Sequence, residues 1–590
     1  MKLLQDYVRR QAESRPEVTA VVCGDQRLTY GELEASSNRL ARLLQASGCE
    51  RGDRVCFAIP KSSTALIALL GIMKADCWHV PLDSSSPPVR GMKIIQSSQP
   101  RLVLGTGATA VLLEEMIGSG VQSGRVQVGW LDNSRKTDEH LNSAFSWNDL
   151  QHCSPETLNH RNCDGDPAHI LFTSGSTGEP KGVVITHANV IHFIEWSVKY
   201  FGIQSSDRVS CHSPLHFDLS YFDIFGAFAA GAQLHLVPPE VTLLPNQIAN
   251  FIRSSELTQW FSVPSVLSYM AKFEAVKFGD FPTLKRLLWC GDVLSTPTLI
   301  YLMKRLPQAK FTNLYGPTET TIASSFYTLA ACPTDEKEAV PIGRGCEGEA
   351  LLVLDEALQP VPRGEIGDLY IQGVGLSPGY WRDTQKTSAA FLRYGPKDSR
   401  IYRTGDLARF GEDGLVYFVG RTDSQIKCRG YRIELGEIEA ALHSLGGVCE
   451  SAVVAIENAD FEGKLICCAY ATPDGNKNLS IELRRRLSNL LPTHMLPSRW
   501  KGFDKLPTNP NGKIDRAKLK ELFLAEERKI VPSPLISPDV DECGSSPVPP
   551  TDKSKPDRVK VNAELDSGIV SARNMFKRRT GVVGGRASGR

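Results

Sequence analysis

The sequence shows no excess of charge of either sign. Its 590 residues contain 67 Lys and Arg against 66 Asp and Glu, which gives a formal net charge of +1. A dedicated nucleic-acid-binding protein normally carries a strong basic excess, so this balance argues against that class. The hydrophobic fraction of 41%, together with 49 glycines, is typical of globular proteins and excludes wholesale disorder. The length predicts about three to five structural units.

The sequence also lacks the cysteine patterns of a zinc site or a disulfide scaffold. Its 15 Cys extend from Cys23 to Cys543 without a Cys-x-x-Cys pair or a His cluster at zinc-ligand spacing. In a long chain, scattered cysteines are typical of reduced, mostly buried apolar side chains.

No hydrophobic run predicts a membrane span or a signal peptide. The nearest candidate, residues 224–239, is too short and contains Gln233 and His235. At the N-terminus, Asp6 and then Arg9 and Arg10 interrupt the apolar run that a signal peptide needs. We therefore expect a soluble, cytoplasmic protein with no membrane partner and no nucleic-acid partner.

Strand-like and helix-like segments alternate through most of the chain. Residues 18–24, 54–60 and 169–172 are rich in β-forming residues, whereas 63–75 has a helical pattern. Thr29 and Glu32 have the spacing of a capping box at the start of a helix. This alternation predicts an α/β fold, with a large N-terminal body of stacked, mostly parallel sheets covered by helices.

Two changes in composition predict domain boundaries. Residues 1–422 are expected to form an N-terminal core domain. The pattern of residues 423–530 predicts a small α+β domain. Residues 531–556 contain seven prolines, and 567–590 contain six basic residues and no acidic one. Such segments cannot bury enough apolar surface to fold alone, so a disordered tail is expected at 531–590.

The most informative segment follows the strand at 169–172 and runs from Thr173 to Gly182, TSGSTGEPKG. Its glycines leave backbone N–H groups available to an anion, and four hydroxyls and Lys181 add donors and positive charge. By composition alone, an ordinary flexible loop is the alternative. A Walker-type phosphate loop requires Gly-Lys-Ser/Thr at the start of a helix. Here Pro180 precedes Lys181 and a β-branched run follows, which excludes that motif.

This loop resembles the phosphate loop of the adenylate-forming enzymes, and specifically of the amino-acid adenylation domains of nonribosomal peptide synthesis. The other motifs of that family follow in order over about residues 1–525. They are LTYGELEASSNRLA (28–41), KADCWHVPLDSSSPPVR (74–90), NLYGPTET (313–320), GDLYIQGVGLSPGYW (367–381), the long segment from YRTGD to ELGEIE (402–439), LPTHMLP (491–497) and LPTNPNGKIDR (506–516).

The resemblance implies ATP and Mg²⁺ as cofactors and gives roles to individual residues. The loop would hold the β- and γ-phosphates through Thr173, Ser174, Gly175, Ser176, Thr177, Gly178 and Lys181. Glu319 would bind Mg²⁺, with Thr318 and Thr320 near the α-phosphate. Tyr315 and Gly316 would lie near the adenine, Asp406 would accept hydrogen bonds from the ribose hydroxyls, and Arg421 would lie near the ribose and phosphate.

The resemblance also implies a mobile small domain. Asp423 would be its hinge. Lys513 would reach into the cleft for adenylation, where it would bridge the substrate carboxylate and the α-phosphate, and swing out for transfer to a thiol. Stabilising the α-phosphate while pyrophosphate leaves calls for positive charge and exact positioning rather than a covalent nucleophile.

Asp218 aligns with the aspartate that pairs with the α-ammonium group of an amino acid in this family. A buried carboxylate is costly without a cation, so this residue distinguishes an amino-acid ligase from a fatty acyl- or aryl-CoA ligase. In the alternative interpretation, Asp223 is the exposed carboxylate and Asp218 merely caps a turn.

The remaining substrate-pocket positions are all apolar, which disfavours polar substrate side chains. They are Leu219, Phe222, Phe261, Leu288, Cys290, Leu314, Ile322 and Ala323. The set resembles the pockets of stand-alone L-prolyl-AMP ligases. L-Proline is therefore the first expected substrate, followed by other small or branched apolar amino acids.

The sequence contains no condensation-type His-His-x-x-x-Asp-Gly and no carrier-type Gly-Gly-x-Ser. The expected enzyme therefore loads the phosphopantetheine thiol of a separate peptidyl carrier protein. Three alternatives stay open at this stage: a CoA ligase of the same superfamily, a D-alanine-carrier protein ligase, and a non-catalytic binding relic of the fold.

Overall fold

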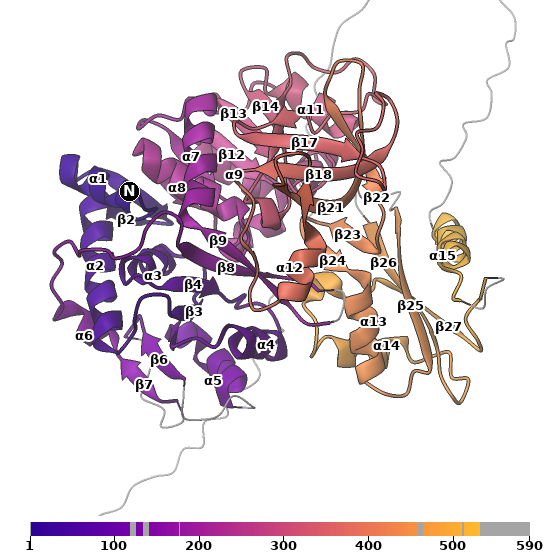
Figure 1. Ribbon diagram of the computed structural model, residues 1–590, viewed down its shortest axis with the longest axis horizontal. Helices are drawn as coiled ribbons and strands as arrows, with labels where there is room; N and C mark the ends of the chain where they lie inside the picture. Colours follow the sequence, from indigo (N-terminus) through magenta and orange to yellow (C-terminus); the bar gives the residue numbers. More distant parts are fainter. Residues whose placement is uncertain are drawn as a thin grey trace, which may run out of the picture. The chain divides into compact units, whose positions relative to one another are not determined.

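The computed structural model describes residues 2–118, 126–133, 141–175, 178–457, 464–509 and 513–530, all within one unit, Met1–Val531. The expected disordered tail, 531–590, lies outside the described residues. Helices and strands alternate as the sequence predicts, and the mixed α/β class is confirmed (Figure 1). No helix in the described ranges is long and apolar enough to span a membrane.

Two large sheets form the N-terminal body, and most of their paired strands are parallel. The first sheet has the order β16 (Arg344–Gly345), β15 (Ser325–Thr328), β14 (Lys310–Tyr315), β13 (Arg286–Trp289), β12 (Gln259–Ser262), β10 (Arg208–Cys211), β11 (Gln233–Leu236), β1 (Thr19–Cys23) and β2 (Gln26–Thr29). The second has the order β19 (Gly379–Tyr380), β9 (Lys181–Thr186), β8 (Pro167–Thr173), β4 (Trp78–Pro81), β3 (Arg54–Ala58), β5 (Leu102–Gly105), β6 (Gln127–Trp130) and β7 (Ser143–Phe145).

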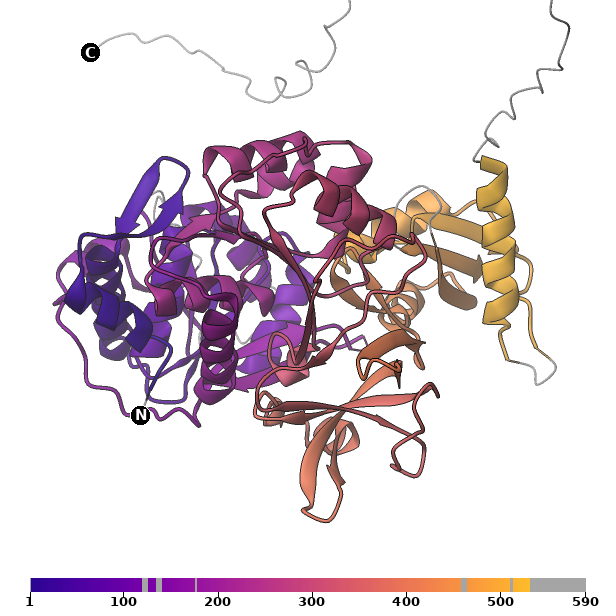
Figure 2. The ribbon, with the colours of Figure 1, turned by 90° about the horizontal axis from the view of Figure 1, so that it is seen from above.

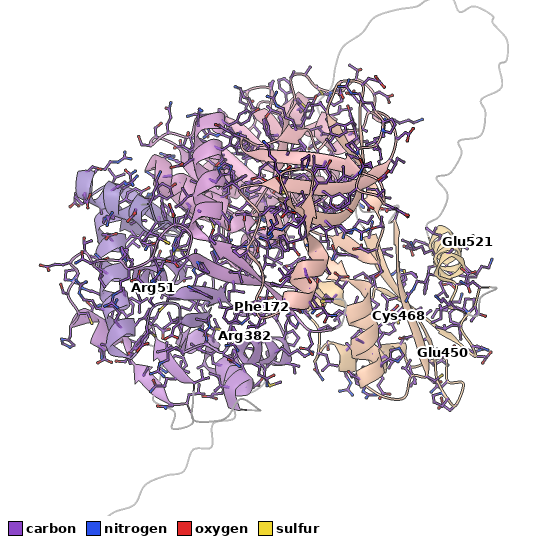
Figure 3. All side chains as sticks on the ribbon, viewed as in Figure 1. Arg51, Phe172, Arg382, Glu450, Cys468 and Glu521 are labelled. Carbon is purple, nitrogen blue, oxygen red and sulfur yellow. The ribbon has the colours of Figure 1, made fainter. Side chains whose placement is uncertain are left out.

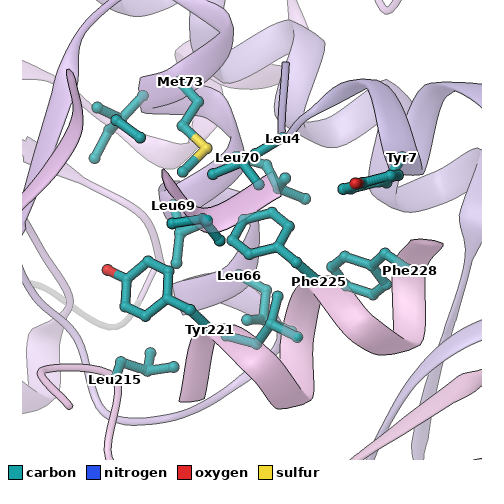
Figure 4. Packing of buried hydrophobic residues seen from close by; sticks show 14 of the residues in the cluster. Leu4, Tyr7, Leu66, Leu69, Leu70, Met73, Leu215, Tyr221, Phe225 and Phe228 are labelled. Atoms are coloured by element: carbon teal, nitrogen blue, oxygen red, sulfur yellow. The ribbon is translucent and has the colours of Figure 1, made fainter. Parts of the chain in front are cut away.

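The central core gathers apolar residues from both large sheets and from the helices between them. These helices are α1 (Asp6–Ser14), α2 (Tyr30–Ala46), α3 (Ser63–Lys74), α7 (His187–Phe201) and α8 (Leu219–Ala230). Figure 4 shows Leu66, Leu69 and Leu70 of α3 packed near Phe225 and Phe228 of α8. The predicted capping box begins α2, where the backbone N–H of Glu32 donates to the Thr29 hydroxyl at 3.2 Å.

Strand periodicity directs alternate side chains to opposite faces of each sheet. Phe57 of β3 joins the central core, whereas Cys56 faces the outer cluster under α4 (Pro88–Ser98) and α5 (Ala110–Gly118). Likewise, Phe261 of β12 points to the central core and Trp260 points to the cluster under α9 (Pro245–Ser254), α10 (Pro264–Lys272) and α11 (Thr296–Arg305). The short helix α6 (Trp147–Gln151) completes the helices of this part of the chain.

A third sheet follows in the chain and carries the YRTGD motif. It contains β17 (Glu349–Leu354), β18 (Gly367–Gly373), β20 (Phe391–Tyr394), β21 (Ser399–Phe410) and β22 (Val416–Arg421), with α12 (Thr384–Ala390) between β19 and β20. Asp406 and Arg421 face each other in the pairing of β21 with β22. This register brings a carboxylate and a guanidinium together although they are 15 residues apart.

The C-terminal segment begins with a two-stranded hairpin, β23 (Gln425–Cys428) and β24 (Tyr431–Glu434), here called the 425–434 hairpin. A three-stranded sheet of β25 (Glu450–Glu457), β26 (Lys464–Ala471) and β27 (Arg499–Phe503) follows. One face of this sheet packs on α13 (Leu435–Ser444) and α14 (Ser480–Leu487), and the other packs on α15 (Arg516–Ile530) (Figures 1 and 2). The α+β character expected of 423–530 is therefore present, whereas the exact boundary at 422 stays a prediction.

Candidate functional site

The loop expected to hold phosphates connects two antiparallel strands. Thr173 at the end of β8 pairs with Lys181 at the start of β9, so no helix begins at the lysine and the exclusion of a Walker-type loop is confirmed. A Cβ atom on Gly175 would lie 2.2 Å from the carbonyl oxygen of Glu179, and Gly178 has a φ of +80°. Only glycine fits both positions without strain. Ser176 and Thr177 lie outside the described residues.

A cavity opens beside this loop, between the N-terminal body and the C-terminal segment. Phe172, labelled in Figure 3, lines it next to Thr173. The expected site residues on its wall are Thr173, Ser174, Asp218, Leu219, Cys290, Gly316, Thr318, Asp406 and Arg421. The C-terminal segment contributes Gln425, Lys427, Gly430, Tyr431, Arg432 and His494. The fold therefore brings residues from widely separated motifs around one space.

Glu319 follows Thr318 of the cavity wall, does not itself line the cavity, and is fully buried in ion pairs with two cations. Its Oε1 lies 3.2 Å from Lys181 Nζ and accepts a 2.8 Å hydrogen bond from the Tyr380 hydroxyl. Its Oε2 accepts a 2.7 Å hydrogen bond from Arg432 Nη1. Burial alone would raise the pKa of Glu319, but the charges of Arg432 and Lys181 outweigh it and hold that pKa well below its usual range.

The carboxylate of Asp406, on strand β21, is held by two donors. Tyr315 donates a 2.5 Å hydrogen bond to its Oδ2, and Arg421 pairs with its Oδ1. Arg421 also donates to both carboxylate oxygens of Asp423, each at 2.8 Å. Asp423 lies between β22 and β23, at the entry to the C-terminal segment. A Cβ on Gly316 would lie 2.6 Å from the Cα of Ala323, so this close approach requires glycine.

Asp218 lines the cavity at the first turn of α8, where its side chain makes no capping hydrogen bond. Burial raises its pKa to about 6, although a hydrogen bond with Thr318 and two backbone N–H groups oppose the rise. Within the described ranges, no Lys, Arg or His forms an ion pair with it. Asp223 is fully buried rather than exposed. The alternative in which Asp218 caps a turn and Asp223 faces solvent is therefore wrong.

The eight apolar pocket positions all belong to the central core. Leu219 and Cys290 line the cavity directly, whereas the other six lie buried behind its wall. Phe222 and Phe261 meet edge to face with ring centroids 5.4 Å apart. Thr321 and Ile322 have positive φ values of 62° and 68°, which is unusual for β-branched residues and marks local backbone strain at this site. Whether the other six side chains contact a substrate stays a prediction.

Lys513 is exposed in a turn before α15, where its backbone N–H donates a 3.0 Å hydrogen bond to the Asn509 side chain. It does not line the cavity. The wall that faces the phosphate loop is formed instead by the 425–434 hairpin and by His494, whose ring stacks on Tyr431 with centroids 3.6 Å apart. The expected catalytic role of Lys513 therefore requires the C-terminal segment to move.

Sequence reasoning missed Arg432, Tyr380 and Lys427. All three belong to motif segments quoted above, but nothing in their local sequence connects them with Glu319 or Tyr315. Lys427 Nζ lies 5.1 Å from the centroid of the Tyr315 ring, a cation–π distance. Arg432 and Tyr380 contact Glu319 across 113 and 61 residues of chain.

The donor set fits a magnesium ion that arrives with a nucleotide. In the described part of the chain, no group of three or more His, Cys, Asp or Glu side chains is arranged to hold a metal. Mg²⁺ commonly uses one or two carboxylates, with phosphates and water supplying its other oxygens. Glu319 could supply such a carboxylate. The buried Thr173 hydroxyl of the cavity wall has no hydrogen-bond partner among the described residues.

Comparisons with known families match nearly the whole described chain. Residues 8–381 match the sequence model for AMP-binding enzymes, and residues 437–513 match the model for the C-terminal domain of AMP-binding enzymes. Bacitracin synthase 1 of Bacillus licheniformis is 34% identical over 523 residues, which cover 88% of this chain and 9% of that protein. The chain thus spans only a small part of several large relatives.

A relative of similar size is zwittermicin A synthase ZmaJ of Bacillus cereus. It is 33% identical over 521 residues, which cover 87% of this chain and 94% of ZmaJ. Among solved structures, the Vibrio cholerae adenylation domain AlmE in complex with glycyl-adenosine-5'-phosphate superposes with a TM-score of 0.76. That match covers 88% of this chain and 98% of AlmE at 24% identity, and supports the fold.

Proposed function

The chain belongs to the AMP-binding enzyme family, and on that premise we propose that it activates an amino acid with ATP and passes the aminoacyl group to a carrier-protein thiol. Aminoacyl-AMP is the intermediate. The first expected substrate is L-proline, and the expected acceptor is the phosphopantetheine thiol of a separate carrier.

The amino-acid assignment rests on the surroundings of the Asp218 carboxylate. This carboxylate lines the cavity beside apolar residues, has a pKa raised to about 6 by burial, and lacks a cationic partner in the described chain. A substrate ammonium group would supply that cation. The apolar Leu219 and Cys290 beside it favour an apolar side chain.

In the first reaction, a carboxylate oxygen of the amino acid attacks the α-phosphorus of ATP, and the bond to pyrophosphate breaks. The loop from Thr173 to Lys181 would hold the departing phosphates, and Asp406 would orient the ribose. Mg²⁺ bound at Glu319 would neutralise phosphate charge. Lys513 would enter the cavity for this step from its exposed position.

In the second reaction, the thiol sulfur attacks the aminoacyl carbonyl carbon, AMP leaves, and the thiol proton passes to solvent. A second cavity supports this step, because it shares Asp83, His216, Phe217 and Tyr431 with the first. It offers a path for the phosphopantetheine arm. With Lys513 outside the cavity and the 425–434 hairpin inside, the structure suits transfer rather than adenylation.

An amino-acid-dependent ATP–pyrophosphate exchange panel tests the proposal. It should include L- and D-proline, glycine, L-valine, D-alanine, benzoate and a fatty acid. We expect exchange with a small apolar amino acid, followed by loading of a phosphopantetheinylated carrier but not of free CoA. Exchange driven only by benzoate or a fatty acid would overturn the amino-acid assignment, and product on free CoA would favour the CoA-ligase alternative.

A further inference from the structure

The two carboxylate oxygens of Glu319 are held by different parts of the chain. Oε1 is held within the N-terminal body by Lys181 and Tyr380. Oε2 is held by Arg432, which belongs to the 425–434 hairpin. Removal of the hairpin would therefore release one oxygen, Oε2, and leave the contacts of the other in place.

Two further contacts with the N-terminal body hold the hairpin in this position, one at Arg432 itself and one just after the hairpin. The Ser174 hydroxyl donates a 2.5 Å hydrogen bond to the backbone carbonyl of Arg432. Arg90 of α4 forms a 2.8 Å ion pair with Glu437 of α13, the helix that follows the hairpin directly. Arg432 thus contacts the phosphate loop through its backbone carbonyl and Glu319 through its side chain.

A divalent cation and Arg432 would both place a positive charge on Glu319 Oε2. Mg²⁺ binds carboxylate oxygens at about 2.0–2.1 Å and completes its shell with water and phosphate. The guanidinium nitrogen lies 2.7 Å from Oε2, so an ion held by that oxygen would compete with Arg432 for it. Without Arg432, Lys181 would still pair with Oε1, but the buried Oε2 would have no cation beside it. A cation at Oε2 is therefore favoured, whether it is Arg432 or a metal ion.

Building on the proposed function, we propose that Arg432 and the divalent cation are alternative partners of Glu319 Oε2. The hairpin enters the site only after the cation has left with pyrophosphate, and Arg432 then replaces its charge. Arg432 is accordingly a positioning residue that orders the two half-reactions. Because coupling between two binding events is reciprocal, the cation must also expel the hairpin.

Cation affinity gives the first test, without any turnover. Mn²⁺ binding is followed by electron paramagnetic resonance in saturating α,β-methylene ATP, a nucleotide whose α–β bond does not break. Arg432→Gln should bind Mn²⁺ more tightly than the wild type, by about 5- to 150-fold for a typical coupling. Lys427→Gln is the matched control, because it removes one positive charge from the same hairpin and cavity without touching Glu319. Equal affinities for Arg432→Gln and the wild type, or equal tightening in both variants, would overturn the proposal.

Hydrogen exchange gives the second test, first in the wild-type protein and then in a Glu319→Gln control. Peptides covering residues 425–434 are compared with α,β-methylene ATP alone, with Mn²⁺ alone, and with both. We expect Mn²⁺ with the nucleotide to increase exchange in the hairpin beyond the effect of the nucleotide alone. The increase should disappear in Glu319→Gln. No difference between nucleotide with and without Mn²⁺ would contradict the exclusion of the hairpin by the cation.

These readouts separate this proposal from the proposed function. If no acid supports pyrophosphate exchange in the wild type, the proposed function fails whatever the Mn²⁺ affinities are. If exchange is present but Mn²⁺ affinity and hairpin exchange do not respond as described, the alternation at Glu319 fails and the ligase activity stands.

Discussion

The hydroxyl of Tyr315 donates a 2.5 Å hydrogen bond to Asp406, the carboxylate expected to hold the ribose. Tyr315 ends β14 of the first large sheet, whereas Asp406 lies on β21 of the third. This contact therefore fixes Asp406 on the third sheet against the end of a strand of the first sheet. The second oxygen of Asp406 pairs with Arg421, so its carboxylate has little rotational freedom.

Tyr315→Phe should weaken ATP binding while leaving the ring in place. Loss of a hydrogen bond to a charged group predicts a rise of about 10-fold in the KM for ATP with little change in kcat. Pyrophosphate exchange at varied ATP measures both parameters. Tyr301→Phe is the control, since its hydroxyl also donates to an acceptor, the Val276 carbonyl at 3.0 Å, away from the cavity. An equal effect in both variants would point to general destabilisation.

Asp218→Asn should abolish amino-acid-dependent exchange and stabilise the free protein at neutral pH. The folded protein holds the pKa of Asp218 near 6, above its ordinary value of 3.8. The folded state therefore binds the proton more tightly, so ionisation costs stability as pH rises from about 4 to 6 and above. The gain in Asp218→Asn should be small at pH 4 and reach at most about 3 kcal/mol at pH 8. Denaturant unfolding at the two pH values measures it.

The same titration predicts that the KM for the amino acid in the wild type rises as pH falls below about 6, because only the ionised carboxylate pairs with an ammonium group. Asp223→Asn is the matched control. Burial raises the pKa of Asp223 well above its usual value, and this residue does not line the cavity, so its amide should retain exchange. A flat pH profile, or equal loss in both variants, would contradict the role of Asp218.

Lys513→Ala should reduce adenylation by about 10²–10³-fold while ATP still binds. Transfer from preformed aminoacyl-AMP to the carrier thiol should persist, because Lys513 lies outside the cavity in the arrangement suited to transfer. Pyrophosphate exchange and single-turnover loading measure the two steps. Lys518→Ala removes another exposed lysine from the same region and should affect neither. Full exchange activity in Lys513→Ala would disprove the assignment.

Cys290→Ala should shift selectivity toward larger apolar amino acids, because Cys290 lines the cavity beside Asp218 and Leu219. Space for one further heavy atom typically changes discrimination by about 10- to 200-fold in kcat/KM. Ratios of kcat/KM for paired substrates that differ by one methylene measure the effect. Cys211→Ala shortens a cysteine buried in the same core but away from the cavity wall, and should leave the ratios unchanged.

The local sequence correctly predicted those elements that depend on a single short-range feature, such as a helix cap or an apolar pattern. The Thr29–Glu32 capping box begins α2, and the apolar pattern of 63–75 forms α3 over Ser63–Lys74. Pro180 and the β-branched run after Lys181 correctly excluded a helix at that lysine, where the structure has strand β9. These features depend on residues within one or two turns of each other, so the chain specifies them before it packs.

The sequence by itself therefore determined the α/β class, the strand-to-strand loop expected to hold phosphates, and some of the residues that line the cavity. Only the tertiary structure decided which carboxylate faces the cavity. Asp218 directly precedes α8 and Asp223 lies within it, and the packing around each determines its exposure to the cavity. The tertiary structure also decided that Arg432, 113 residues from Glu319 in the chain, is a cation on that carboxylate. Such pairings arise when segments distant in the chain pack together. The ion pair becomes strong only after this packing has excluded water from both charges.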